Sequence, residues 1–415
     1  MTPAEPQHAA APRRARRILI PVGLVVLLAI AATAAILLGR DSKPCAAGSA
    51  GCTNAGDTSV SGASPGLAVP GGKSPSPGVS INPSTVASAE PTGAPSRTQA
   101  LAVNATGGGR YPARFSVGAP GVKRYAQSDA SLPVPSGYKV VKPSNKDSKE
   151  WDLYDCNGTV NLNRMYFKAF IYIAENCHGT VNITNSIIAP PPGSNNRSIL
   201  VNSNESGKLT LNVTNTTIRP EPVGLGKINE PLNTPAINDC ATCTINLNRV
   251  DVANTGGMCL CGARTTIRHS WIHDNYIAHL PDPSVQHTGG VFPYGGSGPV
   301  VIENSRLEPG VNAATGKPVP GYWKAITAVL FTQSAGGSRL RNYSVRDSFI
   351  SLGAYGFYPE DGVDMRLTGN VFGPTHWGAI GKCDGGCNVT FAEWSNNVVG
   401  SIDGVPTKKS VQKPS

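Results

Sequence analysis

The chain has 415 residues, ten cysteines and a formal net charge of +10 at pH 7, although only 15 % of its residues are charged. Much of the excess lies near the two ends, because four arginines precede an apolar segment close to the N-terminus and three lysines lie close to the C-terminus. The rest is nearly balanced and offers no extended basic face for a phosphate backbone, so we expect no nucleic-acid partner.

The first apolar segment predicts a membrane anchor. Residues 18–38 contain no charged side chain and are long enough to span a bilayer as a helix. The arginines within residues 1–17 favour a cytoplasmic N-terminus by the positive-inside rule. A cleaved signal peptide is the alternative, since the small residues at 32–35 could form a cleavage site. We therefore expect a single-pass membrane protein with its bulk outside the cytoplasm, or a secreted protein if the segment is removed.

The next segment, residues 39–106, consists mostly of Gly, Ser, Pro, Ala and Thr and shows no apolar period, which predicts a disordered linker. Cys45 and Cys52 within it are expected to close a small loop. Residues 107–405 are enough for a folded domain with a large core. Its Pro- and Gly-containing start, up to about residue 148, is expected to cap the first coil, and residues 406–415 are expected to form a flexible tail.

A short pattern recurs through the folded domain and predicts its architecture. The pattern is an apolar–polar alternation, a polar turn and a closing apolar residue, as in GPVVIENSRL at 298–307. Recurrence of one pattern along a chain is the signature of a solenoid. The frame starts at Val160, Val181, Leu211, Ile245, Thr265, Val300, Tyr343, Met365 and Ala392.

Between successive frames lies a second short apolar run, at 170–179, 198–207, 258–262, 290–296, 328–337, 355–362 and 379–386. Each coil thus offers at least two short strands, which can stack into long parallel sheets around one core. Asparagines recur in the turns and suit a left-handed backbone or stacked amides, namely Asn185, Asn215, Asn304 and Asn396. A β-sandwich is the alternative, but sandwiches do not repeat one turn chemistry at one offset.

Together with the phrases SWIHD at 270–274 and HTGGV at 287–291, the coil pattern over residues 111–405 resembles that of the pectate-lyase-like superfamily, particularly exported actinobacterial repeat proteins. The resemblance implies an all-β, right-handed parallel β-helix. Pectate lyases of this superfamily carry a Trp-Ile-Asp-His phrase near calcium-binding carboxylates. Here Trp271-Ile272 precedes His273-Asp274, so only Asp274 can be carried across. The motifs of galacturonan hydrolases have no evident counterpart.

The even number of cysteines in an exported chain predicts disulfides. Cys156 and Cys177 each precede a repeat frame by four residues, so they should occupy equivalent sites on neighbouring coils, within disulfide reach. The same reasoning pairs Cys240 with Cys261, and leaves Cys243 with Cys259 and Cys383 with Cys387. A zinc site built from the four cysteines between 240 and 261 is the alternative.

Four of the seven histidines lie between His269 and His287, in a segment that also contains Asp274 and Asp282. Long loops on a rigid scaffold often carry function. His273 next to Asp274 could form a general base oriented by a carboxylate, as proton abstraction beside a uronate requires. The same side chains could hold a divalent metal such as calcium. The remaining alternative is a set of polar loop residues without a catalytic role.

A second group of candidates lies on the second strands of successive coils. Tyrosines with mixed charges on a parallel sheet could form a trough for a sugar chain, with His376 and Trp377 as its wall. A solvated sheet face is the alternative. The candidates are Tyr294, Gln333, Tyr358, Glu360, Asp361, Lys382 and Asp384.

These patterns predict an extracytoplasmic protein that engages polysaccharide or cell-wall glycan. One hypothesis is a lyase or epimerase of an acidic glycan. In it His273 or Tyr358 transfers the proton, Lys382 or Arg268 neutralises the carboxylate, and Asp274 orients the base. His287 and the trough residues would bind the substrate. The competing hypothesis is a non-catalytic surface protein that binds glycan through the same face.

Overall fold

The computed structural model describes residues 110–122, 125, 131–144, 147, 149–154, 156–191, 198–202, 209–221, 236–238, 242–260, 264–275, 288–293, 299–312, 315–319, 326–332, 339–382 and 387–414. These residues belong to one compact unit, and their regular secondary structure is all β. No helix in this part of the chain is long and apolar enough to cross a membrane. The expected anchor at 18–38, the linker at 39–106, Cys45 and Cys52 lie outside the described residues.

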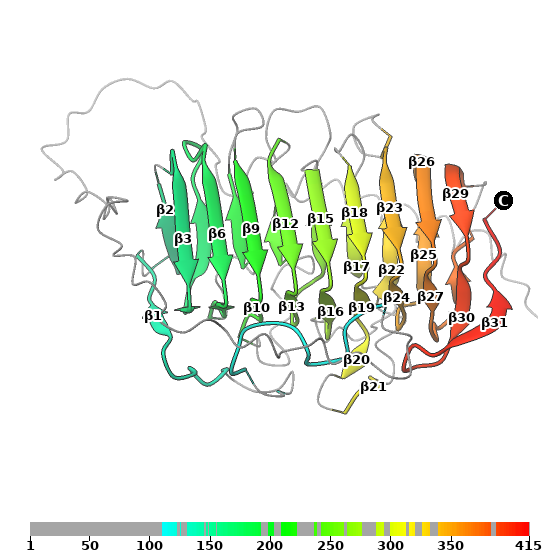
Figure 1. The fold of residues 1–415 in the computed structure, drawn as a ribbon, viewed down its shortest axis with the longest axis horizontal. Helices are drawn as coiled ribbons and strands as arrows, with labels where there is room; N and C mark the ends of the chain where they lie inside the picture. Colours follow the sequence, from blue (N-terminus) through cyan, green and yellow to red (C-terminus); the bar gives the residue numbers. More distant parts are fainter. Residues whose placement is uncertain are drawn as a thin grey trace, which may run out of the picture. The chain divides into compact units, whose positions relative to one another are not determined.

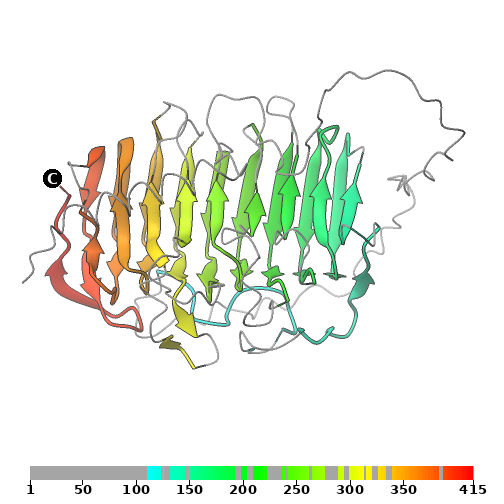
Figure 2. The same ribbon diagram turned by 180° about the vertical axis from the view of Figure 1, so that it is seen from behind.

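The strands form three long sheets, which we call I, II and III. Within each coil the chain passes through a strand of sheet III, then one of sheet I, then one of sheet II. Sheet III contains β3 (Thr159–Asn163), β6 (Thr180–Thr184), β9 (Thr210–Thr214), β12 (Thr244–Asn248), β15 (Arg264–Arg268), β18 (Val300–Glu303), β23 (Tyr343–Arg346), β26 (Asp361–Thr368) and β29 (Asn388–Ser395). Figures 1 and 2 show these strands succeeding one another in chain order along the stack.

Sheet I contains β1 (Lys139–Val141), β4 (Met165–Phe167), β7 (Ile187–Ile188), β10 (Thr217–Ile218), β13 (Asp251–Val252), β16 (Trp271–His273), β19 (Arg306–Glu308), β24 (Phe349–Ile350), β27 (Val371–Phe372), β30 (Val398–Gly400) and β31 (Pro406–Ser410). A separate antiparallel pair contains β20 (Val311–Asn312) and β21 (Lys317–Pro318).

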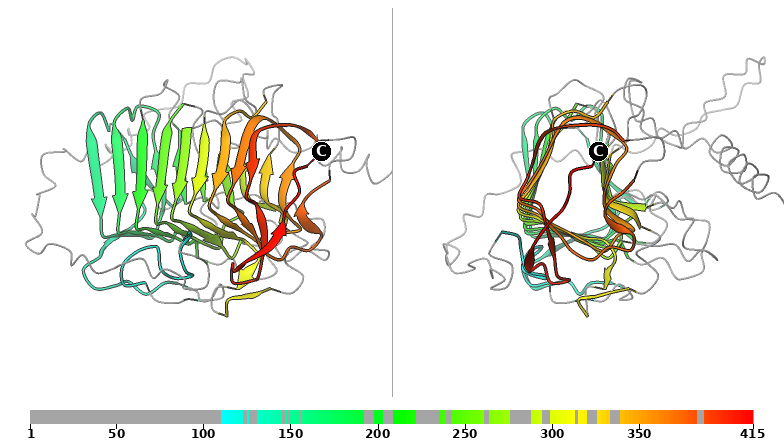
Figure 3. Two further views of the ribbon diagram at one scale, coloured as in Figure 1. Left: turned by 45° about the vertical axis from the view of Figure 1, so that its right-hand side comes forward. Right: turned by 90° about the vertical axis from the view of Figure 1, so that its right-hand side faces the viewer.

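Sheet II contains β2 (Glu150–Leu153), β5 (Phe170–Ile173), β8 (Ile199–Val201), β11 (Ile237–Asn238), β14 (Met258–Leu260), β17 (Thr288–Pro293), β22 (Ile326–Thr332), β25 (Tyr355–Pro359) and β28 (Gly378–Ile380). Seen along the stack, in the right-hand view of Figure 3, successive coils superpose and the sheets lie on separate sides of the core.

The register confirms that the repeat frames stack in parallel. The first seven frame positions are consecutive Cα partners in sheet III, from Val160 next to Val181 to Val300 next to Tyr343. Pairing of Ser344 with Arg366 places Met365 beside Tyr343. Only the last step is irregular, where Met365 pairs with Phe391. Residues distant in sequence therefore become neighbours along the stack.

The predicted left-handed turns are confirmed as well. Each of the four recurrent asparagines has a positive φ between 47° and 54°. They follow a strand of sheet III directly, and the equivalent position in the other coils is also left-handed, at Arg164, Arg249, His269, Asp347 and Gly369. Asn tolerates this conformation better than most residues, so the turn that joins sheet III to sheet I selects it in four of the coils.

The core consists of rows of aliphatic side chains that point inward from the three sheets. Ile183, Val213, Ile267, Ile302 and Val345 form one such row and are fully buried. Burying one such side chain contributes about 1.5–3 kcal/mol. Because each coil adds its own members to the same row, the core is continuous along the stack, as expected for a solenoid.

The predicted disulfide between Cys156 and Cys177 is present and joins neighbouring coils, with a Cα–Cα distance of 4.5 Å. Cys243 and Cys387 are also disulfide-bonded. The side chains of Cys240, Cys259, Cys261 and Cys383 lie outside the described residues, so the other proposed pairs remain predictions.

The expectation of a flexible tail at 406–415 is wrong for its first half. Residues 406–410 form β31, which pairs antiparallel with β30. The indole Nε1 of Trp394 also donates a hydrogen bond to the carbonyl oxygen of Val411, at 3.1 Å. The last coil would otherwise expose an unpaired strand edge, and the tail covers it.

Candidate functional site

The segment before β1 lies along the stack. Residues 110–122, 125 and 131–138, called the strap, pack on the outer face of sheet I (Figure 1, cyan trace). At one end, the Arg110 carbonyl accepts a hydrogen bond from Asn304. At the other, the Leu132 carbonyl accepts one from the Tyr166 hydroxyl, at 2.7 Å. This segment was expected to cap the first coil. The strap instead runs past several coils before the chain reaches β1, which pairs with β4 of the first coil.

The strap lies directly against sheet I at Gly118. A Cβ atom there would lie 2.6 Å from the Thr217 hydroxyl and 2.7 Å from the Asp251 Cβ. The backbone N–H of Gly118 donates to the Arg249 carbonyl, and that of Ala119 donates to the Thr217 hydroxyl. Gly118 also has a φ of 97°, so both conformation and space demand glycine at this point.

Beneath the strap lies a buried cluster around His273. The imidazole Nε2 lies 2.6 Å from Asp251 Oδ1, and Nδ1 lies 3.6 Å from Asp274 Oδ2. The ring stacks on Trp271 with centroids 3.4 Å apart. From the strap, the Tyr125 hydroxyl donates to Asp251 at 3.2 Å. His273 is 0 % exposed, and the other members are also buried.

The charges of this cluster change the protonation of its members. Burial alone would lower the pKa of His273, but the hydrogen bond to Asp251 and the charges of Asp251 and Asp274 outweigh it and raise the pKa to about 9. Burial, followed by the Asp251 charge, raises the pKa of Tyr125 well above its usual value. At neutral pH the His273 ring is thus an imidazolium and the Tyr125 phenol is neutral.

A second buried cluster fixes the strap around Glu308. Arg114 of the strap makes two hydrogen bonds to its carboxylate, at 2.7 and 2.8 Å. Arg306 lies 3.1 Å away on the same strand, and the Trp271 indole N–H donates to it at 2.8 Å. Burial would raise the pKa of Glu308, but the charges and hydrogen bonds of both arginines lower it overall. The carboxylate is therefore ionised and fully paired.

This burial bears on the predicted catalytic role of His273 and Asp274. The sequence placed them at the start of an exposed loop, whereas His273 ends β16 on the outer face of sheet I and both lie beneath the strap. A polymeric substrate cannot reach His273 in this arrangement. Their observed partners, Tyr125 and Asp251, were missed, because they are 126 residues apart and no local signal joins them.

The structure also separates the five predicted catalytic residues. Arg268 lies on sheet III, half exposed, in an ion pair with Glu303, whereas Tyr358 and Lys382 belong to sheet II or the residues after it. His273 and Asp274 lie on and after a strand of sheet I. The five residues therefore do not come together in one place. The alternative with Tyr358 as proton-transfer group and Lys382 as cation stays a prediction, because both lie on or just after strands of sheet II.

The predicted tyrosine face is an aromatic surface on the last coils of sheet II, formed by Phe331, Tyr355, Tyr358 and Trp377. The ring centroids of Tyr358 lie 5.5 Å from Phe331 and 5.6 Å from Tyr355, and Tyr355 lies 5.4 Å from Trp377. Trp377 is 59 % exposed. Gly381, the register neighbour of Tyr358, leaves room for its ring, since a Cβ there would lie 2.3 Å from Tyr358.

Polar side chains border the aromatic surface. His376 lies next to Trp377, with ring centroids 5.2 Å apart, and Glu360 and Lys382 are exposed. Asp361 was predicted to lie on the sugar-binding face. It is instead buried and forms an ion pair with Arg339 at 2.7 Å. His287, Tyr294, Gln333 and Asp384 lie outside the described residues.

The described residues contain no group of three or more His, Cys, Asp or Glu side chains placed to hold a metal ion. The calcium site suggested by the pectate-lyase resemblance therefore stays a prediction from the sequence, without a ligand set in this part of the structure.

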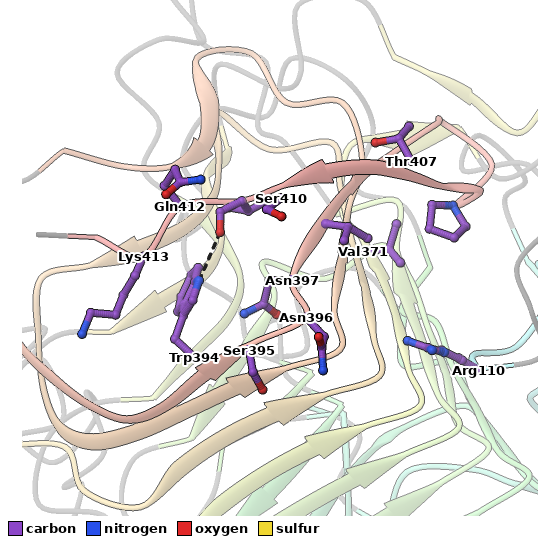
Figure 4. Close-up of a pocket in the computed structure, with 13 residues that line it drawn as sticks. Arg110, Val371, Trp394, Ser395, Asn396, Asn397, Thr407, Ser410, Gln412 and Lys413 are labelled. Carbon is purple, nitrogen blue, oxygen red and sulfur yellow. Dashed lines mark hydrogen bonds between the residues drawn. The ribbon is translucent and has the colours of Figure 1, made fainter.

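A pocket lies at the C-terminal end of the stack, between the last coil and the tail (Figure 4). None of the residues predicted to form a site lines it. The hydrogen bond between Trp394 and the tail crosses one side of it. Its lining includes Arg110, Val371, Trp394, Ser395, Asn396, Asn397, Thr407, Ser410, Gln412 and Lys413. We interpret it as a groove left by the capping tail.

Comparison of the chain with protein-family models, curated proteins and solved structures found no match.

Proposed function

We propose that the chain is a membrane-anchored, extracytoplasmic protein that binds polysaccharide through the aromatic surface of sheet II. The coils are taken as a right-handed β-helix, because parallel crossover connections are right-handed in nearly all proteins. Anchoring through residues 18–38 follows from the charge pattern of the N-terminus. The disulfide between Cys156 and Cys177 supports an oxidising compartment outside the cytoplasm.

The aromatic surface is the observation that carries the proposal. Clustered apolar groups that are exposed to solvent mark interaction sites. Trp377 is exposed and Phe331, Tyr355 and Tyr358 are half-buried, and their rings form such a cluster on a rigid sheet. The apolar faces of sugar rings stack on aromatic rings, while Tyr hydroxyls and neighbouring charged groups can bond sugar hydroxyls. Polysaccharide is therefore the ligand whose chemistry fits this surface best.

A binding role is favoured over a lyase or epimerase. Proton abstraction requires a base within hydrogen-bond reach of the substrate carbon acid and a cation beside the carboxylate. Of the residues predicted for these roles, His273 is covered by the strap and Arg268 lies on sheet III, which leaves only Tyr358 and Lys382 near sheet II, without Asp274 to orient the base. The non-catalytic hypothesis needs only the surface that the coils of sheet II bring together.

Replacing Trp377 with alanine is expected to weaken glycan binding by roughly tenfold or more, because about 1.4 kcal/mol of stacking is lost. The full chain, in detergent, is tested by calorimetry or affinity electrophoresis against a panel of acidic and neutral polysaccharides. Release of unsaturated uronate is followed in parallel by ultraviolet absorbance.

Tyr154 provides a matched control. It is an aromatic residue that is 56 % exposed and follows β2, at the opposite end of sheet II. Tyr154→Ala should bind like the unmodified protein. Equal losses in both variants, or unchanged binding in Trp377→Ala, would contradict the proposal. Uronate release that survives Trp377→Ala would favour an enzyme at another site.

A further inference from the structure

The outer face of sheet III changes character along the stack. In its first four strands, β3, β6, β9 and β12, every outward residue is Thr or Asn. We call these outward residues the Thr/Asn face; their strands are turned toward the viewer in Figure 1. From β15 onward charged residues enter this face, beginning with Arg264 and Arg268 and continuing with Glu303. An uncharged, hydroxyl- and amide-bearing array therefore covers only the first coils.

The Thr/Asn face is geometrically regular. Its strands pair residue for residue, without a bulge, from Thr159 next to Thr180 to Thr210 next to Thr244. The side-chain amides of the central row form a ladder: Asn182 donates to Asn161 and Asn212 donates to Asn182, both at 2.8 Å, and Asn246 donates to Asn212 at 2.9 Å. Threonine is β-branched and has few rotamers. The polar atoms are thus held in fixed rows before any ligand binds.

The repeat of these rows can be compared with that of a water lattice. Neighbouring strands lie about 4.8 Å apart. In fully hydrogen-bonded water, O–H···O bonds of about 2.75 Å meet at the tetrahedral angle and place second-neighbour oxygens about 4.5 Å apart. Along the strand, outward residues are spaced about 6.7 Å apart. The corresponding distance in the water lattice is the repeat perpendicular to its layers, about 7.3 Å for the same O–H···O length. The spacing of the rows matches the water lattice more closely along the stack than along the strand. The amide ladder also runs along the stack and fixes the side chains in that direction.

The chemistry of the face limits the class of ligand. Neutral hydroxyls and amides both donate and accept hydrogen bonds, whereas charges would orient nearby water around themselves and disturb a lattice. A periodic neutral array fits a periodic neutral solid, and a fixed array loses little entropy on binding. Crystalline polysaccharide would need flat apolar contacts as well, and the aromatic side chains suited to these lie on sheet II. We infer that the Thr/Asn face of sheet III binds the surface of ice.

The full chain, labelled with a fluorophore and kept in detergent, is tested for incorporation into a slowly growing polycrystalline ice hemisphere and for inhibition of ice recrystallisation. The variant Thr210→Lys places a long charged side chain on the face, in the outer row that begins each strand. The control Ser344→Lys makes the same change at an outward position of β23 on the same sheet, outside the face. Trp377→Ala separates this activity from glycan binding.

The unmodified chain and the variants Ser344→Lys and Trp377→Ala should enter the ice, whereas Thr210→Lys should be excluded and should lose recrystallisation inhibition while still binding glycan. The inference is overturned if the unmodified chain is excluded from ice as a soluble control protein is. It is also overturned if both lysine variants behave alike, or if Thr210→Lys instead abolishes binding to powdered cellulose or chitin with no effect in ice.

Discussion

Replacing Glu308 with alanine is expected to lower the free energy of unfolding by about 3–5 kcal/mol. The carboxylate is 0 % exposed and is the shared partner of Arg114 from the strap, Arg306 from sheet I and the indole N–H of Trp271. Its removal leaves the buried Arg306 guanidinium without its charge partner and takes away the two hydrogen bonds that join Arg114 to sheet I. Urea denaturation followed by circular dichroism measures the loss, and limited proteolysis tests whether the strap becomes susceptible to cleavage.

Glu303 offers the matched control. It also forms ion pairs with two arginines, Arg268 and Arg346, but both arginine side chains are 52 % exposed. Charges left unpaired there are solvated by water, so Glu303→Ala should cost only about 1 kcal/mol. If the two variants lost equal stability, or if Glu308→Ala left the strap resistant to protease, the assigned role of the buried cluster would be wrong.

The stability of the folded unit is expected to fall as the pH rises from 6.5 to about 9.5. His273 has a folded-state pKa of about 9, raised above the ordinary value of 6.5 by Asp251 and Asp274 against the opposing effect of burial. A raised pKa means that the folded state binds the proton more tightly. The contribution is therefore fully present below pH 6.5 and is lost as the pH passes through 9, with a total of about 3 kcal/mol.

Denaturation midpoints between pH 6 and 9.5 measure this slope in the unmodified chain and in His273→Gln. The glutamine variant lacks the titrating group, so its stability should vary little over the same range, whatever its absolute value. Burial also raises the pKa of Tyr125, but its usual value of 10 lies above the range. A slope of equal size in both proteins would show that another group is responsible.

The repeat made most of the fold predictable because its cause is local. A strand of sheet III needs inward apolar residues such as Ile183 or Val213, and its turn needs a residue such as Asn185 or Asn215 that accepts a positive φ. Each coil has these same requirements, so similar residue types recur at equivalent positions of the sequence. Once the period was recognised, the register followed, and with it the bridge between Cys156 and Cys177.

The strap could not be predicted in the same way. Its contacts join residues far apart, such as Arg114 with Glu308 over 194 positions, and each occurs once. His273 was misplaced for the same reason, since its exposure depends on whether Tyr125 lies above it. Of the residues that form the aromatic surface, Tyr358 and Trp377 were among the predicted candidates. The contributions of Phe331 and Tyr355 were missed, because their proximity depends on the exact register of β22 and β25.

The central claim is that successive coils lie side by side in one register, and engineered cysteines test it most directly. Asn212 and Asn246 are Cα partners on adjacent strands, about 4.8 Å apart, within the range of a disulfide. The pair Asn212→Cys with Asn246→Cys should therefore cross-link on mild oxidation, as mapped by mass spectrometry. Asn182→Cys with Asn246→Cys is separated by the intervening strand β9 and should not. Absence of the first cross-link, or equal formation of both, would contradict the stacked coils.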